Sequence, residues 1–484
     1  MEFLDVVVVG AGLSGIAAGH YLQALCASRS YAILESRDAI GGTWDLFRYP
    51  GVRSDSDMST LGYSFRPWTS DTSFAPAEAI RDYVQQTARD EGIDTHIRFG
   101  RRVTGANWDS KRARWIVATT GSDGDSLIEC SFLFFCSGYY DYERGYEPQW
   151  PGREHYSGTI VHPQQWPKDL DYSGKRVVVI GSGATAITLV PEMAKRAAHV
   201  TMLQRSPSYI MGLPARDKLG ALLRKCLPQR AAHRIVRWKN IVLATLLFQF
   251  SRRRPEAMKR LIRKGALRLL GPSFDVDRHL SPRYNPWDQR LCIAPDADFF
   301  RSIRAGKAAI VTDEIECFTA QGLRLASGEE LLADVIVSAT GLRLKMMGGA
   351  ALTIDGAQVD GSQSVVYRGT MYSGVPNLAV ASGYTNASWT LKCELSARYV
   401  CRLLNEMQAK GLDTCVAVRD ESVAASEPVI DLSSGYIQRA AATLPRQGDR
   451  TPWRMYQNYF LDLLTLRFSR LRDGVLKLSR VGRD

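Results

Sequence analysis

The sequence has no Cys-x-x-Cys pair, although nine cysteines occur among its 484 residues. Dithiol redox centres and zinc sites both use closely spaced cysteines, so neither is expected, and no other metal site is predicted. Unclustered cysteines in odd number are typical of a protein kept in a reducing compartment. We therefore expect a cytoplasmic location.

Long apolar runs are also missing. The run IVLATLLFQF at 241–250 is about half of what a membrane span requires, so it predicts a buried or surface-lying helix. The first apolar run, VVVV at 6–9, leads straight into glycines, so the N-terminus is expected to be part of the fold and not a signal peptide. No motif that reads nucleic acid is present, and nucleic acid is not an expected partner.

Acidic residues are scarce in one segment. Between Arg216 and Leu270 there are sixteen Lys and Arg against two acids, a local charge of +14, whereas the whole chain carries +12 and the remainder therefore −2. The segment has a helical pattern. Two interpretations stay open for 216–270: a solvated helical face, and peripheral contact with an anionic membrane surface.

Glycines, in contrast, are placed in a specific pattern near the N-terminus. Residues 1–22 predict a buried strand, a turn with Gly10, Gly12 and Gly15, and a helix. Gly10 allows the turn, Gly12 lets a pyrophosphate approach the helix N-terminus, and Gly15 lets helix and strand pack closely. The next strand, YAILE, ends at Glu35, whose carboxylate suits the hydroxyls of an unphosphorylated ribose, as in FAD or NAD.

The same pattern returns at 175–194, with Gly181 and Gly183 in the first two places and Ala186 in the third. Here the following strand ends in Arg205 and Ser206. A cation beside a hydroxyl suits the 2′-phosphate of NADPH, whereas the alternative is an arginine that only caps a strand end.

Two further buried strands, in 132–138 and 335–341, end in small-residue turns and mark where the chain crosses between these units. The predicted fold is α/β with two Rossmann-like dinucleotide-binding domains and a helical excursion in the second. We assign 1–145 and 340–484 to a discontinuous FAD domain. The NADPH domain is assigned to 146–339, including the basic helical excursion at 213–280. A strand, a polar turn and a helix are expected within 374–391.

One FAD site and one NADPH site together imply hydride transfer from nicotinamide to flavin. A disulfide reductase would need a cysteine pair near the flavin, and the sequence offers none. The reduced flavin is then expected to reduce another protein or to react with oxygen.

Two fingerprints identify a family. The stretch YSGTIVHPQQWP at 156–167 matches F-x-G-x-x-x-H-x-x-x-W-P with Tyr156 in place of phenylalanine, and it contains Gly158, His162 and Trp166. The stretch GGTWDLFRYPGVRSD at 41–55 meets G-G-x-W-x-x-x-x-Y-P-G-x-x-x-D in full. The chain thus resembles the type I Baeyer–Villiger monooxygenases over nearly its whole length.

The resemblance implies a flavoprotein that uses NADPH and O2 to insert one oxygen into lipophilic ketones, giving esters or lactones through a C4a-peroxyflavin, and that also oxygenates sulfides or thioamides. Two alternatives stay open: a heteroatom (N or S) monooxygenase with little ketone activity, and an uncoupled NADPH oxidase or redox sensor. The oligomeric state is not predicted.

The resemblance also implies catalytic residues. Arg290, in NPWDQRLC, matches the family's arginine before a Leu-Cys dipeptide, although the family more often has a proline between Arg and Leu. A fixed cation there would stabilise an anion in a dry pocket, with Asp55 orienting it. The alternatives are a structural salt-bridge arginine and a turn-capping aspartate.

The 156–167 loop is interpreted as an interdomain linker through Gly158, His162 and Trp166, with His162 neither acid nor base; simple packing of His162 is the alternative. Substrate contacts are expected from 342–350, 385–391 and the region of Trp453. The predicted cofactor-binding residues are Gly10, Gly12, Ser14, Gly15, Glu35, Gly42, Thr43, Trp44, Asp45, Leu46, Arg53, Ser54, Asp55, Val103, Gly181, Ser182, Gly183, Ala184, Thr185, Ala186, Ile187, Arg205 and Ser206.

Overall fold

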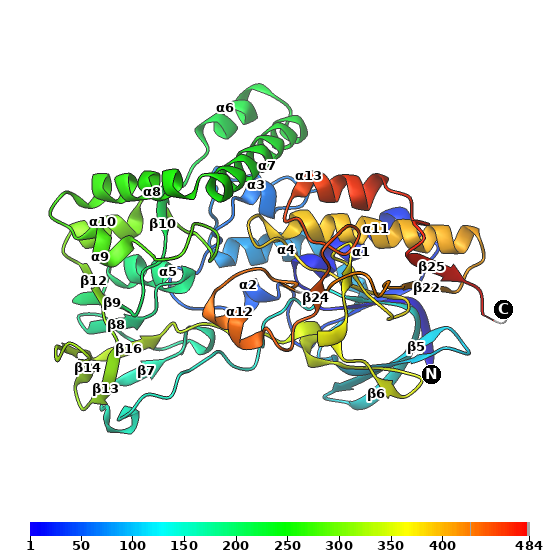
Figure 1. Cartoon of the computed structure of the whole chain (residues 1–484), viewed down its shortest axis with the longest axis horizontal. Coiled ribbons are helices and arrows are strands. Elements are labelled where there is room, and N and C mark those ends of the chain that lie inside the picture. The colour runs from blue at the N-terminus through cyan, green and yellow to red at the C-terminus, as the bar shows by residue number, and fades with distance from the viewer. Residues whose placement is uncertain (426, 482–484) are drawn as a thin grey trace.

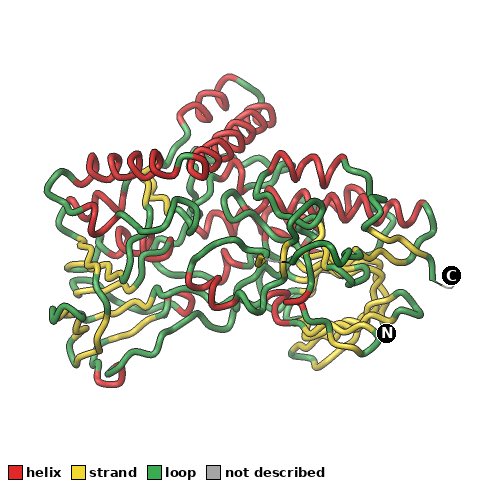
Figure 2. Tube along the Cα trace, viewed as in Figure 1, coloured by secondary structure: helices red, strands yellow, loops and turns green. Residues whose placement is uncertain are grey.

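Two separate β-sheets organise the chain, each covered by helices. The computed structural model describes residues 1–425 and 427–481. A nine-stranded sheet lies in one half of the molecule and a five-stranded sheet in the other, with most long helices along one side of both (Figures 1 and 2). This confirms the predicted α/β class with two Rossmann-like units.

The larger sheet runs in the order β18-β17-β4-β5-β6-β1-β2-β3, and β21 pairs with β6. Its centre, where β1 lies between β2 and β6, is parallel and nearly free of polar residues, as expected for strands covered on both faces. The strands are β1 (Glu2–Val9), β2 (Tyr31–Leu34), β3 (Ile97–Arg98), β4 (Arg102–Asp109), β5 (Arg114–Gly121), β6 (Gly124–Phe135), β17 (Ala351–Ile354), β18 (Ala357–Gln358) and β21 (Leu378–Val380).

The smaller sheet is parallel throughout, in the order β12-β9-β8-β16-β7. Its strands are β7 (Thr159–Val161), β8 (Arg176–Ile180), β9 (His199–Gln204), β12 (Ala308–Thr312) and β16 (Val335–Ser338). Every strand of this sheet thus comes from 159–338, and every strand of the larger one from 2–135 or 351–380. The exact domain boundaries at 145 and 340 stay a prediction.

Helices cover both sheets. The predicted strand, turn and helix within 374–391 correspond to β21 and the start of α11. The helices outside the basic segment are α1 (Leu13–Leu25), α2 (Thr43–Leu46), α3 (Met58–Leu61), α4 (Ala77–Asp90), α5 (Ala184–Met193), α9 (Val276–Leu280), α10 (Asp298–Arg304), α11 (Trp389–Ala409), α12 (Gly435–Ala440) and α13 (Tyr459–Asp462), which continues into a π-helical turn at Leu463–Phe468.

Short strands complete the fold in small separate sheets. They are β10 (Ile210–Leu213) with β11 (Cys292–Pro295); β13 (Ile315–Thr319), β14 (Gly322–Leu325) and β15 (Glu330–Leu332); β19 (Val366–Tyr367) with β20 (Met371–Tyr372); β22 (Thr414–Ala417) with β25 (Leu476–Ser479); and β23 (Glu427–Pro428) with β24 (Arg446–Gln447).

The basic segment forms three helices, α6 (Lys218–Cys226), α7 (Gln229–Arg253) and α8 (Pro255–Leu270), on one edge of the molecule (Figure 1). The apolar run 241–250 lies in the second half of α7. Among the described residues, no helix combines the length and the apolar character that crossing a membrane requires.

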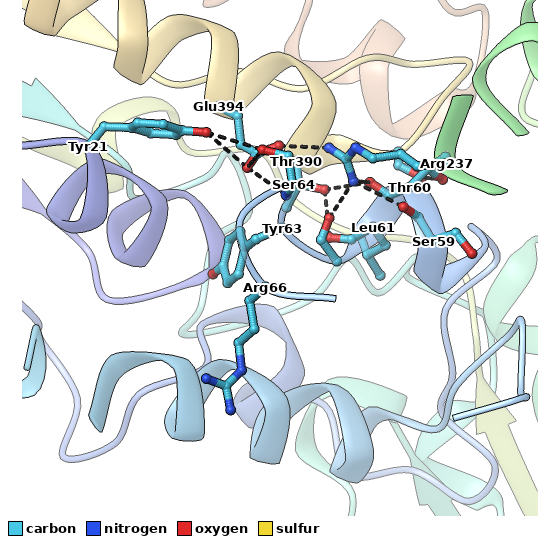
Figure 3. A network of polar contacts seen from close by, with 12 residues as sticks. Tyr21, Ser59, Thr60, Leu61, Tyr63, Ser64, Arg66, Arg237, Thr390 and Glu394 are labelled. Atoms are coloured by element: carbon cyan, nitrogen blue, oxygen red, sulfur yellow. Dashed lines mark hydrogen bonds and ion pairs between the residues drawn. The ribbon is translucent and has the colours of Figure 1, made fainter. Parts of the chain in front are cut away.

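Helix α7 is held against the larger sheet's half by a buried arginine (Figure 3). The Arg237 guanidinium donates to the carbonyls of Ser59, Thr60 and Gly62 and to the Glu394 carboxylate on α11, with Nη2 to Oε2 at 2.7 Å. Both side chains of the pair are less than a tenth exposed. The helices α6 to α8 leave and rejoin the smaller sheet's half, and Arg237 fixes them to the half that contains the larger sheet.

Candidate active site

A cavity of about 870 Å³ lies where the parallel strands of both sheets end. Its lining includes the residues that follow β1, β2 and β6 in one sheet and β8, β9 and β16 in the other. Ligands of open parallel sheets bind at these carboxyl ends, and large ligand pockets measure roughly 300–1,000 Å³. The cavity therefore has the position and size of a nucleotide site shared between the sheets.

Two helices begin at this cavity without a capping side chain. Gly12 is the N-cap of α1 and Gly183 that of α5, and neither first turn contains an acidic residue. The preceding glycines, Gly10 and Gly181, have φ of +103° and +130°, which turn the chain sharply from strand to helix. Free backbone N–H groups at a positive helix end attract phosphate, so the two turns fit the pyrophosphates of FAD and NADPH.

Glu35 borders the cavity at the end of β2 and also supports the first turn. Its Oε2 accepts the Ala11 N–H at 2.7 Å and its Oε1 the Arg37 N–H at 2.9 Å. The carboxylate is only 5% exposed. Its position is therefore fixed by the backbone, as a ribose acceptor requires.

Arg205 and Ser206 border the same cavity beyond β9, next to the second turn. Ser182 in that turn donates to the Ser206 carbonyl at 3.1 Å. Arg205 is exposed and forms no ion pair with a carboxylate in the described part of the chain. A cation free of protein partners is available for a phosphate, which supports NADPH as the second cofactor.

Arg290 and Asp55 meet at the cavity. The guanidinium makes two parallel contacts with the carboxylate, Nε to Oδ2 at 2.8 Å and Nη2 to Oδ1 at 2.9 Å. Asp55 raises the pKa of Arg290 above its usual value, which already exceeds neutral pH by far. Arg290 is therefore a permanent cation held in one orientation. This geometry is compatible with both roles considered for Arg290 from the sequence, a structural salt bridge and a catalytic cation.

Tyrosines surround this pair, and the sequence analysis did not single them out. Tyr139, Tyr140 and Tyr436 are close enough to Arg290 to influence its charge, and burial raises the pKa of each phenol well above its ordinary value. They stay neutral at physiological pH. The segment GYYDY at 138–142 follows β6 directly, so the rule that ligands bind beyond strand ends could have indicated Tyr139 and Tyr140.

A second, mostly apolar pocket adjoins the cavity. Six residues line both spaces: Gly138, Tyr139, Arg290, Tyr384, Trp389 and Tyr436. The expected substrate segments contribute Met346, Thr385 and Trp389, whereas Trp453 itself is buried against Tyr367 and Met455 lines the pocket instead. Much of the wall comes from 366–384 and 429–445, which the sequence analysis did not indicate. Arg290 thus lies where the larger and more polar cavity meets the apolar pocket.

The cavity brings together most of the predicted cofactor residues. Those that border it are Gly10, Gly12, Ser14, Glu35, Gly42, Thr43, Trp44, Arg53, Ser54, Asp55, Val103, Gly181, Ser182, Gly183, Ala184, Thr185, Arg205 and Ser206. Those that do not are Gly15, Asp45, Leu46, Ala186 and Ile187.

Some of these residues have protein partners. Asp45 is held by Arg37 and Arg48, so its side chain supports the loop instead of facing the cavity. Arg53, in the larger sheet's half, forms an ion pair with Asp298 on α10, in the smaller sheet's half. A β-carbon on Gly15 would lie 1.8 Å from the Gly10 carbonyl oxygen, which explains the glycine as a packing requirement.

The 156–167 loop contributes β7 and a tight turn beside the site. The His162 ring is packed against Gly145, its Nδ1 accepts the Gln164 N–H at 3.1 Å, and burial lowers its pKa. Gly158 leaves room for the Tyr156 phenol. Trp166 packs on the core of the smaller sheet. The loop lies where the chain passes from one sheet to the other, and its coupling role stays a prediction.

The metal-ligating and thiol side chains of the described residues are scattered. Over residues 1–425 and 427–481, no group of His, Cys, Asp and Glu side chains is arranged to hold a metal ion. The nine cysteines are free thiols in the structure. Cys292, the first residue of β11 and two positions after Arg290, is buried, and burial raises the pKa of its thiol to about 12.

Known proteins resemble the chain in sequence and fold. Residues 4–218 match the family model described as flavin-binding monooxygenase-like. The FAD-containing monooxygenase EthA of Mycobacterium tuberculosis is 50% identical over 480 residues, which are 99% of this chain and 98% of that protein. An oxidized steroid monooxygenase bound to NADP superposes with a TM-score of 0.78 at 22% identity, covering 99% of this chain and 100% of that one. A cyclohexanone monooxygenase bound to epsilon-caprolactone gives 0.72 at 20% identity, with the same coverage.

Proposed function

Because this chain belongs to the FAD-containing monooxygenases of the Baeyer–Villiger type, we propose that it transfers one oxygen atom of O2 to lipophilic ketones and to sulfur in sulfides or thioamides at the junction that Arg290 occupies. A ketone, O2, NADPH and a proton would give an ester or lactone, NADP⁺ and water. When bound, FAD supplies the electron transfer from NADPH and the activation of O2.

The observation that carries this proposal is that Arg290 lines both the cavity and the apolar pocket. Its guanidinium borders the large cavity, which fits the cofactors, and the smaller apolar pocket, whose lining suits a lipophilic group. A negative charge that develops between the two spaces would meet a fixed cation with little reorganisation, and such stabilisation is the largest contribution in many enzymes.

Asp55 gives that cation its orientation. The hydrogen bond from Nη2 and the ion-pair contact of Nε leave part of the guanidinium occupied by Asp55 and direct the rest towards the junction. The neutral phenols of Tyr139 and Tyr436 line the same place and could donate hydrogen bonds without adding charge. We assign Arg290 as the catalytic residue and Asp55 as its positioning partner.

The apolar pocket determines which substrates are accepted. Its wall contains aliphatic and aromatic side chains such as Val366, Val380, Ile430 and Met455. Such a lining favours lipophilic molecules and excludes water from the reacting atoms, which limits hydrolysis and wasteful release of peroxide.

Product analysis tests the proposal. Purified holoenzyme is incubated with NADPH and O2 and with either a long-chain ketone or a thioether, products are identified by mass spectrometry, and hydrogen peroxide is measured. Ester from the ketone supports the proposed reaction. Sulfoxide without ester would restrict the activity to heteroatoms, and peroxide without either product would favour the uncoupled oxidase.

A further inference from the structure

An exposed apolar face extends over α6, α7 and the C-terminal helical turn on one edge of the molecule. Its side chains are between 39% and 64% exposed. They are Leu219 and Leu222 on α6; Ile235, Trp238, Val242, Leu243, Leu246 and Phe250 on α7; and Leu461, Leu464 and Phe468 at the C-terminal turn. We call this set the α7 face. Large contiguous apolar surfaces on a folded protein mark contacts with a partner or a membrane.

The face results from the periodicity of α7. Ile235, Trp238, Val242 and Leu246 are spaced by three, four and four residues, so they lie on one side of the helix. The opposite side is buried. The C-terminal turn joins the face because the Trp238 ring lies 5.9 Å from that of Tyr459 and 6.1 Å from that of Phe460, both on α13.

Positive charge surrounds the face. Helix α7 contains no acidic residue. Arg230 and Arg234 at its start, Arg253 at its end, and Arg467 and Arg470 around Phe468 are exposed. None of these five arginines takes part in an ion pair within the described residues. A lone apolar stripe with free cations on its rim is the pattern of a helix that lies in a membrane interface.

We propose that the α7 face docks on a lipid bilayer that contains anionic lipids. Charge selects this occupant. A second copy related by a two-fold axis would bring the same basic rim against itself, which is unfavourable without acids to compensate. An anionic headgroup layer neutralises the arginines while the acyl region covers the leucines and aromatic rings.

The position of the face suggests what docking is for, a point that rests on the proposed function. On the inner side of α7, Ile241 packs with Tyr384 and Leu391 in one buried cluster. Tyr384 lines the apolar pocket, and its hydroxyl donates to Asp462 of α13 at 2.6 Å. The wall of the pocket therefore lies directly beneath the docking face, and a lipophilic substrate dissolved in the bilayer would be close to it.

Vesicle sedimentation tests the proposal with the holoenzyme and no substrate. Vesicles of phosphatidylcholine alone are compared with an equal mixture of phosphatidylcholine and phosphatidylglycerol, at low and high salt. We expect binding to the anionic vesicles that salt weakens, because exposed charges are screened. The double variant Leu246→Glu, Phe468→Glu should lower the bound fraction about tenfold or more, since two apolar side chains no longer insert.

The matched control is Leu127→Glu, which adds the same charge at a 49% exposed leucine on β6, outside the face. It should bind like the unchanged protein. Flavin content and NADPH oxidation verify that each variant is folded. The double variant Arg230→Gln, Arg234→Gln provides a second test that leaves the apolar stripe intact.

Equal binding of all variants, or no binding at low salt, would overturn the proposal. If the unchanged protein is a dimer that binds no vesicles, and the double variant is a monomer, the face contacts a second copy of the chain instead of a membrane. Neither result depends on which substrate the enzyme oxidises.

Discussion

Arg290 and Asp55 face each other through one hydrogen bond and a second ion-pair contact, although 235 positions separate them in the chain. Asp55 lies in the loop between α2 and α3, in the larger sheet's half, and Arg290 precedes β11, in the smaller sheet's half. Their contact therefore requires both halves to be assembled. The pair that we propose as the catalytic centre can therefore form only when the two halves are correctly placed.

Replacing Arg290 with alanine should abolish oxygenated product while FAD binding and slow NADPH oxidation persist, because the cation stabilises charge only in the oxygen-transfer step. Product yield and peroxide are measured together. Arg290→Lys keeps the charge but loses the two-pronged contact, so it should recover only part of the yield. Full yield from the alanine variant would remove Arg290 from the mechanism.

Replacing Arg205 with alanine should raise the KM for NADPH and leave that for NADH nearly unchanged. The loss corresponds to about 1 to 3 kcal/mol for a charged hydrogen bond to the 2′-phosphate. Steady-state kinetics with both nucleotides measure it. Arg196→Ala is the control, since this arginine is 63% exposed at the far end of α5 and does not border the cavity. Equal losses for both nucleotides would refute the phosphate assignment.

Breaking the Arg237–Glu394 pair from one side should destabilise the protein strongly. In Glu394→Gln a buried guanidinium loses its counter-charge, and single disruptions of buried pairs cost about 3 to 5 kcal/mol. Thermal unfolding of the holoenzyme measures the loss. Asp334→Asn breaks the exposed pair with Arg176 and should cost about 1 kcal/mol or less. Similar melting temperatures for both variants would contradict the importance of burial.

Stability should fall in mildly acidic solution because of His233 on α7. Burial lowers its pKa from 6.5 to about 4. Between pH 6.5 and 4 the unfolded state binds more protons than the folded state, so protonation of His233 favours unfolding. The contribution of His233 to the free energy of unfolding is therefore complete above pH 6.5 and is lost as the pH falls towards 4. The loss amounts to at most about 3 kcal/mol.

Urea unfolding over this pH range checks the His233 prediction. His233→Gln should flatten the pH dependence, whereas His155→Gln, at a histidine 71% exposed, should leave it unchanged. An identical slope in all three proteins would exclude His233 as the cause.

The sequence predicted the parts of the site that depend on local backbone geometry. The turns at Gly10 and Gly181 and the strand ends at Glu35 and Arg205 follow from strand, glycine and helix in fixed order, and the structure places all four at one cavity. Family resemblance indicated Arg290 and Asp55. The fold class followed from the same repeated units.

The remaining features depend on contacts between distant segments. Tyr436 reaches the site from the first turn of α12 and Tyr384 from the loop between β21 and α11, and their positions depend on the packing of α12 and α13. The anchoring of α7 by Arg237 was equally hidden, because in sequence this arginine is one among sixteen basic residues of a segment that we interpreted as a solvated or lipid-facing surface. Only the fold shows that it points inward.

The Arg237 anchor also constrains how the molecule can move. Four hydrogen bonds from one guanidinium bind the excursion of one half to the other half. Any rotation of the smaller sheet relative to the larger one would have to strain or break these hydrogen bonds, together with the Arg53–Asp298 and Arg290–Asp55 ion pairs that also join the two halves.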